Sequence, residues 1–247
     1  MKKEIYKKVA QIIRDAKRVT AFTGAGISVE SGIPPFRGKN GLWNKYDPVF
    51  LDIGYFHNHP KESWKLIKEI FYDFFGQAEA NDAHYALAKM ENAGLLQAVI
   101  TQNIDNLHQE AGGQTVHEFH GTSRTMACVN CGQKIESAKV DLNNLPPHCP
   151  NCGGILKPDF VFFGEPIPEP SNRLSFHEAE ISNVFLVIGT TGEIMPACMI
   201  PQVAKNNGIT IIEINTKPSK FTHQITDIFL HDRATVAMNR LAEELGI

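Results

Sequence analysis

Three kinds of segment are missing from this sequence of 247 residues, and their absence excludes several classes of protein. Apolar runs such as Val184 to Gly189 are far shorter than the about 20 residues that a membrane-spanning helix needs. The first residues, Met1 to Lys8, lack the continuous apolar stretch of a secretory signal. No dense basic tract is present, and a formal charge of −3 gives no reason to expect a nucleic-acid partner. We therefore expect a soluble, cytoplasmic protein with neither a membrane nor a direct nucleic-acid partner.

Cysteine is scarce as well, and its spacing suits metal binding in a reducing compartment better than a disulfide framework. Four of the five cysteines form two Cys-x-x-Cys pairs: Cys128, Cys131, Cys149 and Cys152. The seventeen residues between the pairs, and the glycines after each pair, fit the two-knuckle pattern of a zinc site. Since no fifth ligand pattern lies nearby, we predict one structural Zn²⁺, and we do not count the adjacent His148 as a ligand. The fifth cysteine, Cys198, is expected to be buried in a helix.

Helical and strand-like patterns alternate along the chain, which predicts an α/β fold with a parallel sheet and right-handed crossovers. Strands are expected at residues 19–22, 98–101, 115–119, 184–188 and 209–214. Helices are expected at residues 3–17, 81–93, 103–111, 196–206 and 234–245. A further helical face is shared by Trp64, Ile67, Ile70, Phe71, Phe74 and Phe75, and residues 38–60 are expected to be irregular.

A change of composition divides the chain into two domains. Residues 125–157 are polar, cysteine-bearing and rich in turn residues, which indicates a separate module. We predict a Rossmann-like domain, a parallel sheet with helices on both faces, from residues 1–38, 87–121 and 158–247. The smaller domain then consists of a helical insertion at 39–86 and a zinc module at 122–157.

The first predicted strand runs into a glycine-rich turn, Thr23-Gly24-Ala25-Gly26, as at the opening of a dinucleotide-binding unit. Gly24 and Gly26 allow the backbone to approach a pyrophosphate, and Ser28 can cap the short helix that follows. The third glycine of the usual fingerprint is replaced by Val29. Taken alone, this glycine motif is about equally consistent with a plain tight turn and with a phosphate-binding site.

Four longer motifs resemble those of one family, the sirtuins. Thr23 to Gly38 resembles the sirtuin cofactor-binding loop, and Thr101 to His108 resembles the nicotinamide-pocket motif. His120-Gly121 lies at a strand end, where the family has its catalytic base, and Val161 to Glu165 is similar to the substrate-pairing segment. The motifs occur in family order and at family-like spacing, so the resemblance to bacterial and archaeal members of single-domain length covers nearly the whole chain.

Each motif also has a simpler reading when it is considered by itself. Asn103 and Asp105 can cap a helix or form an Asx turn, and His120 is one of ten histidines. Phe162 and Phe163 would ordinarily be core residues. The joint occurrence of the motifs, and the position of His120 at the carboxyl end of a strand, favour the functional reading.

The resemblance implies an NAD-dependent protein lysine deacylase (deacetylase) that acts on acyl-lysine proteins or peptides and yields nicotinamide and O-acyl-ADP-ribose. It implies His120 as general base on a ribose hydroxyl, with Asn103 as a second catalytic residue. The acyl-lysine peptide is expected to add as a strand along Val161, Phe162, Phe163, Gly164 and Glu165. The implied NAD contacts are Gly24, Ala25, Gly26, Ser28, Phe36, Arg37, Gln102, Asn103, Ile104, Asp105, Gly189, Thr190, Thr191, Asn215 and Ala234.

Within this set the family assigns distinct tasks. Asp105, with the Ile104 backbone, is expected to hold the nicotinamide carboxamide. Gln102 and Asn103 would position ribose hydroxyls and a water molecule. Phe36 is expected to shield the reactive ribose face, and Arg37 to fix the cofactor loop.

Two departures from the family bear on the substrate. Sirtuins that prefer succinyl or malonyl lysine use a Tyr-x-x-Arg pair in the helical insertion, and this chain has no arginine between Arg37 and Arg124. We therefore expect neutral acyl groups. The stretch Gly192 to Pro196 replaces the more apolar segment usual at the substrate groove, and its Glu193 either favours basic peptide flanks or caps the next helix at Pro196.

Two other functions use the same motifs. One is ADP-ribosyl transfer to a protein, and the other is a non-catalytic NAD sensor, which the presence of Asn103, Asp105 and His120 disfavours. Dehydrogenase activity is disfavoured further because Val29 breaks the usual fingerprint. The sequence leaves the oligomeric state open.

Overall fold

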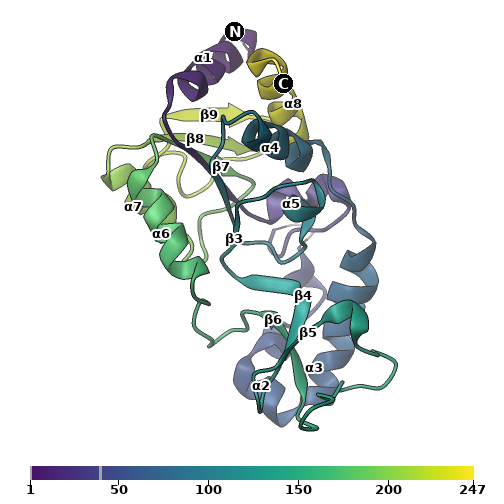
Figure 1. Cartoon of the computed structure of the whole chain (residues 1–247). Coiled ribbons are helices and arrows are strands. Elements are labelled where there is room, and N and C mark those ends of the chain that lie inside the picture. Colours follow the sequence, from purple (N-terminus) through teal and green to yellow (C-terminus); the bar gives the residue numbers. More distant parts are fainter. Residues whose placement is uncertain (1, 39–40) are drawn as a thin grey trace.

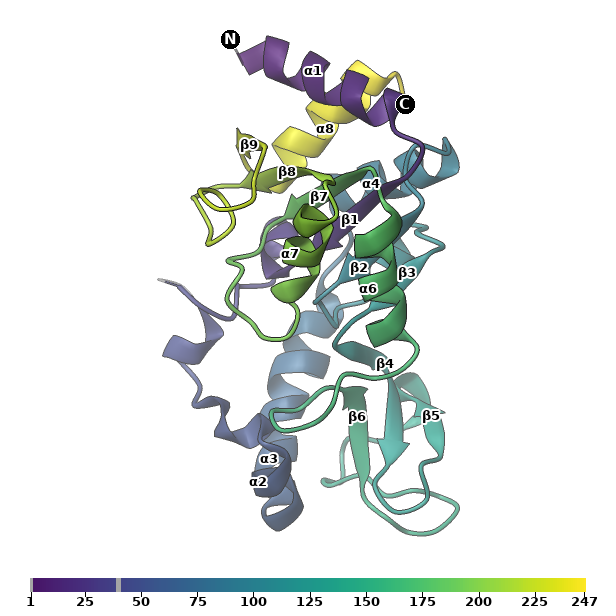
Figure 2. The ribbon, with the colours of Figure 1, turned by 90° about the vertical axis from the view of Figure 1, so that its left-hand side faces the viewer.

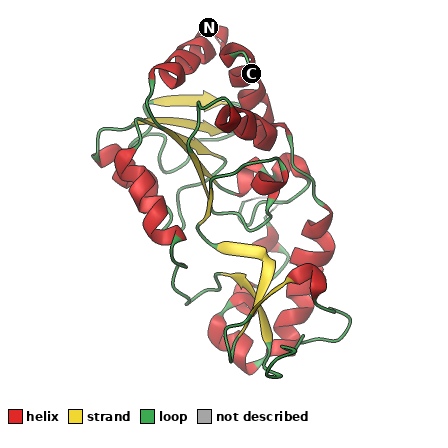
Figure 3. Cartoon of the chain, viewed as in Figure 1, coloured by secondary structure: helices red, strands yellow, loops and turns green. Residues whose placement is uncertain are grey.

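The computed structural model describes residues 2–38 and 41–247. A six-stranded sheet and a three-stranded sheet lie toward opposite ends of an elongated molecule, and both chain termini lie at the end with the larger sheet (Figures 1 and 3). Among the described residues, no helix combines the length and apolar character that crossing a membrane requires.

The larger sheet is parallel throughout and has the order β3-β2-β1-β7-β8-β9. Its strands are β1 (Val19–Thr23), β2 (Ala98–Thr101), β3 (Val116–Glu118), β7 (Val184–Ile188), β8 (Thr210–Asn215) and β9 (Ile228–His231). Strands β1, β2 and β3 follow one another in one direction across the sheet. Strand β7 then lies on the other side of β1, and β8 and β9 continue in the opposite direction, which is the Rossmann strand order. Such sheets bind ligands at the carboxyl ends of the strands where the order reverses, here between β1 and β7.

Helices cover both faces of this sheet, as predicted (Figures 1 and 2). One face packs on α1 (Lys2–Asp15), α4 (Asp82–Asn92) and α8 (Ala234–Leu245), and the other on α6 (Ser171–Ile181) and α7 (Met199–Asn206). Neighbouring residues of β1 point to opposite faces, because Ala21 belongs to the first core and Phe22 to the second. Every position of the strand is therefore buried, as in parallel sheets covered on both sides.

The second part of the molecule has a core of its own. The antiparallel sheet β5-β4-β6 comprises β4 (Gly121–Cys128), β5 (Lys134–Glu136) and β6 (Leu156–Phe160). It packs against α2 (Ile53–Asn58), α3 (Pro60–Ile67) and a π-helical turn at Lys68–Phe74, around the fully buried Trp64. Trp64 Nε1 donates to the Leu156 carbonyl at 2.8 Å, which joins the insertion to the zinc module.

These separate cores support the predicted division into two domains, which we retain as a proposal. Position 87 falls inside α4 and position 158 inside β6, so we propose boundaries at the ends of these two elements. Positions 39 and 40, where the predicted insertion begins, lie outside the described residues.

Most of the predicted strands and helices are confirmed, and the exceptions have local causes. The helix predicted at 103–111 is wrong over its first half, because Asn106 has a left-handed φ of 67° and α5 spans only Leu107–Glu110. The helix predicted at 196–206 begins only at Met199. Phe74 is 53% exposed and does not share the buried face with Phe71 and Phe75, because the wider π-helical turn shifts its direction.

Other elements were not predicted. Residues 38–60, predicted to be irregular, contain α2 and 3₁₀ turns at Leu42–Asn44 and Pro48–Leu51. The sequence interpretation also lacked α6, β9 and the three strands of the smaller sheet.

Candidate active site

The loops after β1 and β7 meet backbone to backbone at the switch point. Gly24 N–H donates to the Ile188 carbonyl at 3.0 Å, and Gly26 N–H donates to the Gly189 carbonyl at 2.8 Å. A Cβ atom added to Gly26 would lie 2.6 Å from the Gly189 Cα, and Gly189 itself has a left-handed φ of 63°. Both positions therefore require glycine, and the crevice they line is where this fold admits a nucleotide.

Ser28 connects this glycine loop to the second motif. The prediction that Ser28 caps a helix is wrong: it lies between 3₁₀ turns at Ala25–Ile27 and Val29–Ser31, and its side chain caps neither. Instead its Oγ donates to Asp105 Oδ2 at 2.6 Å and accepts from Asn103 Nδ2 at 3.2 Å. The first and second motifs thus form one hydrogen-bonded unit.

The amide side chains of the second motif complete this unit. The buried Asn103 also donates to the Gly24 carbonyl at 3.2 Å. Gln102 Nε2 donates to Thr190 Oγ1 at 3.2 Å, so the segment spans the loops after β1 and β7. In the next loop, Asn215 Nδ2 donates to the Thr190 carbonyl at 2.9 Å. The structure therefore brings most of the predicted NAD contacts to one edge of the sheet.

A small pocket opens beside this unit and is lined by Ala25, Ile33, Phe36, Phe75, Asn103, Ile104 and Asp105. Its walls are mostly apolar and include a single carboxyl and a single side-chain amide. The sequence interpretation did not assign Ile33 or Phe75 to the site. Ile33 lies within the cofactor-loop motif, whereas Phe75 comes from the insertion and carries no motif signal.

Burial raises the pKa of Asp105, and the hydrogen bonds from Ser28 and the Leu107 backbone N–H oppose this effect.

Three other predicted NAD contacts, Phe36, Arg37 and Ala234, lie at the margins of this site. The Phe36 ring is tilted against Trp43, with ring centroids 5.2 Å apart, and Arg37 is exposed. Ala234 starts α8, whose second residue donates its backbone N–H to Glu30 Oε2 at 3.1 Å, next to the cofactor loop.

His120 follows β3 and faces the same crevice as Gln102. Its Nδ1 lies 2.9 Å from the Gln102 carbonyl oxygen, which can only accept, so Nδ1 carries the hydrogen and Nε2 keeps a lone pair. Burial lowers the pKa of His120, although the bond to Gln102 opposes this effect, so the ring is neutral near pH 7. A neutral imidazole with a free Nε2 is equipped to act as a general base.

The predicted substrate segment lies directly beside this histidine. Val161 N–H donates to the His120 carbonyl at 2.8 Å. On its other side, Phe163 pairs with the insertion: its N–H donates to the Leu51 carbonyl at 2.8 Å, and its carbonyl accepts from Ile53 N–H at 3.1 Å. One edge of the segment is thus already paired, and Phe163 itself is 48% exposed.

A larger cavity of about 470 Å³ is lined in part by Ile104, Asp105 and Asn106. Its apolar wall is formed by Phe71, Tyr72 and Phe75, and its polar rim includes Asn106, Glu110, Ser123, Arg124 and Glu136. Arg124 is already paired, because its Nη2 donates to Glu118 Oε2 at 2.9 Å. The cavity shares Phe75, Ile104 and Asp105 with the small pocket.

Glu193 does not cap the next helix, so that alternative is wrong. Helix α7 has Cys198 at its N-cap and no side-chain cap there. Glu193 instead lies 3.9 Å from the Lys220 ammonium. The adjoining Gly192, at φ 72°, packs on the Phe221 ring, so the loop after β8 supports this part of the groove.

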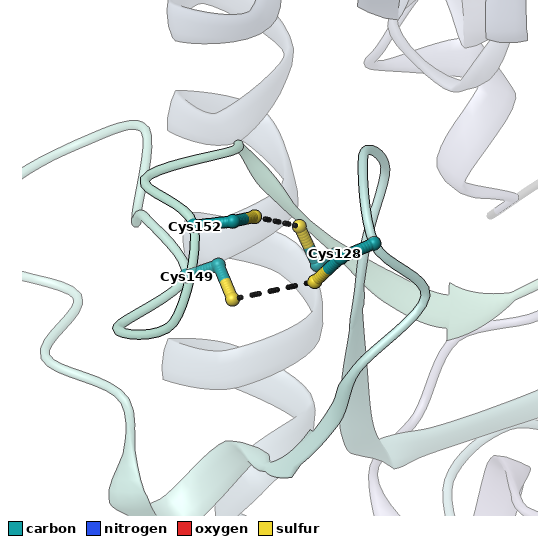
Figure 4. Close-up of side chains that lie close together, drawn as sticks. Cys128, Cys149 and Cys152 are labelled. Atoms are coloured by element: carbon teal, nitrogen blue, oxygen red, sulfur yellow. Dashed lines mark hydrogen bonds between the residues drawn. The ribbon is translucent and has the colours of Figure 1, made fainter.

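The four predicted zinc ligands form one cluster at the far end of β4 (Figure 4). Their sulfur atoms all lie within 4.8 Å of one another, with 3.4 Å between Cys128 and Cys152 and 3.8 Å between Cys131 and Cys149. A tetrahedral Zn²⁺ with Zn–S bonds of about 2.3 Å requires separations of about 3.8 Å. The donor set and its geometry therefore fit a closed, structural zinc site.

The remaining residues near the cysteines take other roles. His148 Nδ1 hydrogen-bonds with the Gly153 carbonyl at 2.9 Å, in agreement with its exclusion as a ligand. The predicted burial of Cys198 in a helix is wrong, because it lies half-exposed at the start of α7 with its Sγ 3.2 Å from Met195 Sδ.

Two buried histidines lie behind the site. His84 on α4 and His108 on α5 pack with ring centroids 4.9 Å apart. His108 Nε2 shares a 2.9 Å hydrogen bond with Thr23 Oγ1, which donates to Thr101 Oγ1. Burial lowers the pKa of His84 to about 4 and that of His108 well below its usual range. Both rings are neutral parts of the support for β1 and β2.

The strand order and the glycine-lined crevice place the chain in a class, the α/β proteins that bind a dinucleotide at a switch point. The model of the Sir2 family matches residues 24–196. An NAD-dependent protein deacylase of Aeropyrum pernix is 42% identical over 244 residues, which cover 96% of each chain. One of Pyrococcus abyssi is 43% identical over 243 residues, again 96% of each chain.

Solved structures agree in fold as well as sequence. A mutant Sir2 homologue in complex with ADP ribose superimposes with a TM-score of 0.92 at 37% identity, covering 97% of this chain and 96% of the other. Sir2Tm bound to a propionylated peptide gives a TM-score of 0.89 at 33% identity and covers 98% of each chain. The chain belongs to the Sir2 family.

The buried histidine pair predicts a loss of stability in mild acid. The pKa of His84 is lowered to about 4 in the folded chain, whereas that of a histidine in the unfolded chain is about 6.5. The unfolded chain therefore binds this proton more tightly than the folded chain does. Stability should therefore fall as the pH drops from about 6.5 to about 4, by on the order of 3 kcal/mol from His84 alone. Urea unfolding across this range measures the slope. His84→Gln should flatten it, whereas the exposed His223→Gln should not, and equal slopes in both variants would contradict the assignment.

The cysteine cluster predicts that zinc is needed for folding of the small domain, since such sites supply on the order of 10 kcal/mol. Cys149→Ser should bind less than one zinc per chain, measured by mass spectrometry of the purified protein, and should melt at a lower temperature. Cys198→Ser removes a thiol outside the cluster and should keep both properties. A full zinc content in Cys149→Ser would disprove the site.

Proposed function

We propose that this protein is an NAD-dependent protein lysine deacylase, which transfers an acyl group from a lysine side chain to ADP-ribose and releases nicotinamide. The observation that carries the proposal is His120, whose Nδ1 is bound to the Gln102 carbonyl while its own backbone carbonyl accepts from Val161 N–H. A base is thus held between the nucleotide crevice and the substrate segment. Relatives named NAD-dependent protein deacylase support the same activity.

NAD, as co-substrate, supplies a nicotinamide–ribose bond whose cleavage leaves a ribose carbon open to attack by the acyl oxygen. The residues at the switch point fit it, because the loops that carry Gly24, Gly26 and Gly189 meet at the carboxyl ends of β1 and β7, where this fold binds a nucleotide. Asp105 and the Ile104 backbone would hold the carboxamide, and Asn103 and Gln102 would orient the ribose hydroxyls. Phe36 would cover the reactive face.

His120 would take a proton from a ribose hydroxyl through Nε2. The Gln102 carbonyl fixes the tautomer this requires, and the lowered pKa keeps the ring unprotonated at neutral pH. A positioned general base of this kind contributes a rate factor of roughly 10² to 10⁴. Zinc would take no part in these steps, because the cysteine cluster lies at the opposite end of β4 from Gly121.

The acyl-lysine peptide would pair along Val161 to Glu165. Since Phe163 already pairs with Leu51 and Ile53, and Phe162 bonds to Glu165 through both backbone groups, the peptide would pair with the remaining backbone groups of the segment. Reading of the backbone in this way tolerates many side chains. The complex of Sir2Tm with a propionylated peptide supports an acyl-lysine peptide as substrate.

The charges around the larger cavity favour neutral acyl groups. Its rim carries Glu110 and Glu136, whereas its one arginine, Arg124, is already engaged by Glu118. Tyr72 is followed three residues later by Phe75 and not by an arginine. A carboxylate-bearing acyl chain would therefore meet acidic and aromatic side chains without a free guanidinium. The volume of about 470 Å³ leaves room for chains longer than acetyl.

His120→Ala should abolish deacylation, because no other group can take the ribose proton, while leaving ADP-ribose affinity and melting temperature nearly unchanged. Turnover is followed by mass spectrometry of an acetyl-lysine peptide with NAD. Exposed His223→Ala serves as the matched control and should keep full activity. Normal turnover in His120→Ala would overturn the assignment. With NAD labelled in the ribose, label in a small acyl-ADP-ribose supports deacylation, whereas label retained on protein indicates ADP-ribosyl transfer.

Acyl selectivity can be tested with one peptide carrying acetyl, propionyl, hexanoyl or succinyl lysine. We expect the neutral chains to be turned over at least about tenfold more efficiently than succinyl, a difference of about 1.4 kcal/mol in transition-state binding. The measured quantity is kcat/KM at saturating NAD. A preference for succinyl would contradict the charge argument. Phe75→Arg, which introduces a guanidinium at the shared wall of both cavities, should move the selectivity toward succinyl.

A further inference from the structure

Lys157 is a buried lysine whose ammonium is fully engaged. The residue lies in β6 and is only 9% exposed, which is rare for a charged side chain unless it is paired. Its Nζ donates to the carbonyls of Pro158 at 2.9 Å and Phe160 at 2.8 Å, and to Glu165 Oε2 at 3.0 Å. These bonds use all three donors of the ammonium. The Nζ also lies 4.2 Å from the centroid of the Phe162 ring, a cation–π contact.

Glu165 extends this network into the substrate segment. The same Oε2 atom accepts from Phe162 N–H at 2.7 Å, and Glu165 N–H donates to the Phe162 carbonyl at 3.0 Å. Gly164, between them, has a left-handed φ of 91°. Residues 162–165 therefore form a turn closed by Glu165, and Lys157 ties this turn to the end of β6.

The turn carries the backbone that the proposed peptide would pair with. It continues from Val161, whose N–H is bonded to the His120 carbonyl. Just before it, the backbone of β6 packs so closely on Gly121 that a Cβ there would lie 2.3 Å from the Asp159 carbonyl oxygen. A displacement of residues 161–165 would therefore change the position of the peptide relative to the catalytic base.

We propose that Lys157 is a positioning residue for substrate, which holds the segment 161–165 in the conformation that pairs with the acyl-lysine peptide. The inference rests on the proposed function. Recognition through the backbone depends on a preorganised strand, because the cost of ordering a loose segment is subtracted from peptide affinity. Without the ammonium, the Glu165 carboxylate and two carbonyls would lose their donor in a largely buried place, and the turn would relax.

The test compares Lys157→Met, which keeps the length of the side chain, with Lys157→Arg, which keeps the charge and the donors. Lys157→Met should raise the KM for the peptide about tenfold or more while kcat changes less than about threefold. Lys157→Arg should restore the KM to within about threefold of wild type. Affinity for ADP-ribose, which binds at the other sheet, should be unchanged in both.

Lys134→Met is the matched control. Lys134 of β5 pairs at 2.7 Å with Asp159 of β6, across the central strand β4, and its side chain is 64% exposed. It should therefore bind and turn over peptide like wild type. Hydrogen exchange of residues 161–165 gives a second readout: exchange should be faster in Lys157→Met and unchanged in Lys134→Met.

The proposal would be overturned if a folded Lys157→Met had the wild-type KM for the peptide and unchanged hydrogen exchange. It would also be overturned if this variant lost affinity for the peptide and for ADP-ribose equally. If that variant fails to fold, Glu165→Gln replaces it: weakening the ion pair should still raise the peptide KM, and an unchanged value would overturn the proposal. Peptide binding measured by fluorescence polarisation needs no turnover. A wild type that binds acyl-lysine peptide without deacylating it would refute the proposed function alone.

Discussion

The close approach of the Gly26 and Gly189 backbones is the constraint on which the rest of the site depends. Parallel strands β1 and β7 end at the same sheet edge, and their loops can meet at hydrogen-bonding distance only because neither glycine has a Cβ. This contact fixes the loop that carries Ser28. Ser28 in turn holds Asp105 and Asn103, and Gln102 reaches back to Thr190 in the loop after β7. The proposed nucleotide site, the proposed carboxamide pocket and the anchor of His120 therefore share one hydrogen-bonded frame.

Burial acts in opposite directions on the acid and the base of this frame. It raises the pKa of Asp105 and lowers that of His120, so it favours the neutral form of both groups. The same principle applies behind the site, where His84 and His108 support β1 and β2 as neutral rings. Low local charge suits the proposed reaction, in which nicotinamide would leave as a neutral molecule and a proton would move to a single defined nitrogen.

The smaller domain supplies residues that lie opposite the proposed nucleotide site. Its cysteine cluster closes the far end of β4, while the near end places Gly121 and β6 against the catalytic histidine. Phe75 from the insertion reaches the carboxamide pocket, and Leu51 and Ile53 pair with Phe163. The substrate segment is thus built from three parts of the chain: β6, the insertion and the turn closed by Lys157 and Glu165. A zinc ion at this cluster would hold the loops of the module.

Local patterns in the sequence determined much of this protein. Apolar runs predict β1, β2, β7 and β8, cysteine spacing predicts the zinc cluster, and contiguous motifs supply Gly24 to Ser28, Gln102 to Asp105 and His120. These features are local because neighbouring residues share one strand, one turn or one metal knuckle. Tertiary structure alone decided the rest: Ser28 bonds across 77 positions to Asp105 instead of capping a helix, and Phe75 joins a pocket whose other walls lie far away in the chain. Lys157 looks like an ordinary surface lysine in the sequence. Its ammonium is buried only because β6 folds against the 162–165 turn. Burial and long-range hydrogen bonds depend on which segments meet in space, and neighbours in the sequence do not reveal this.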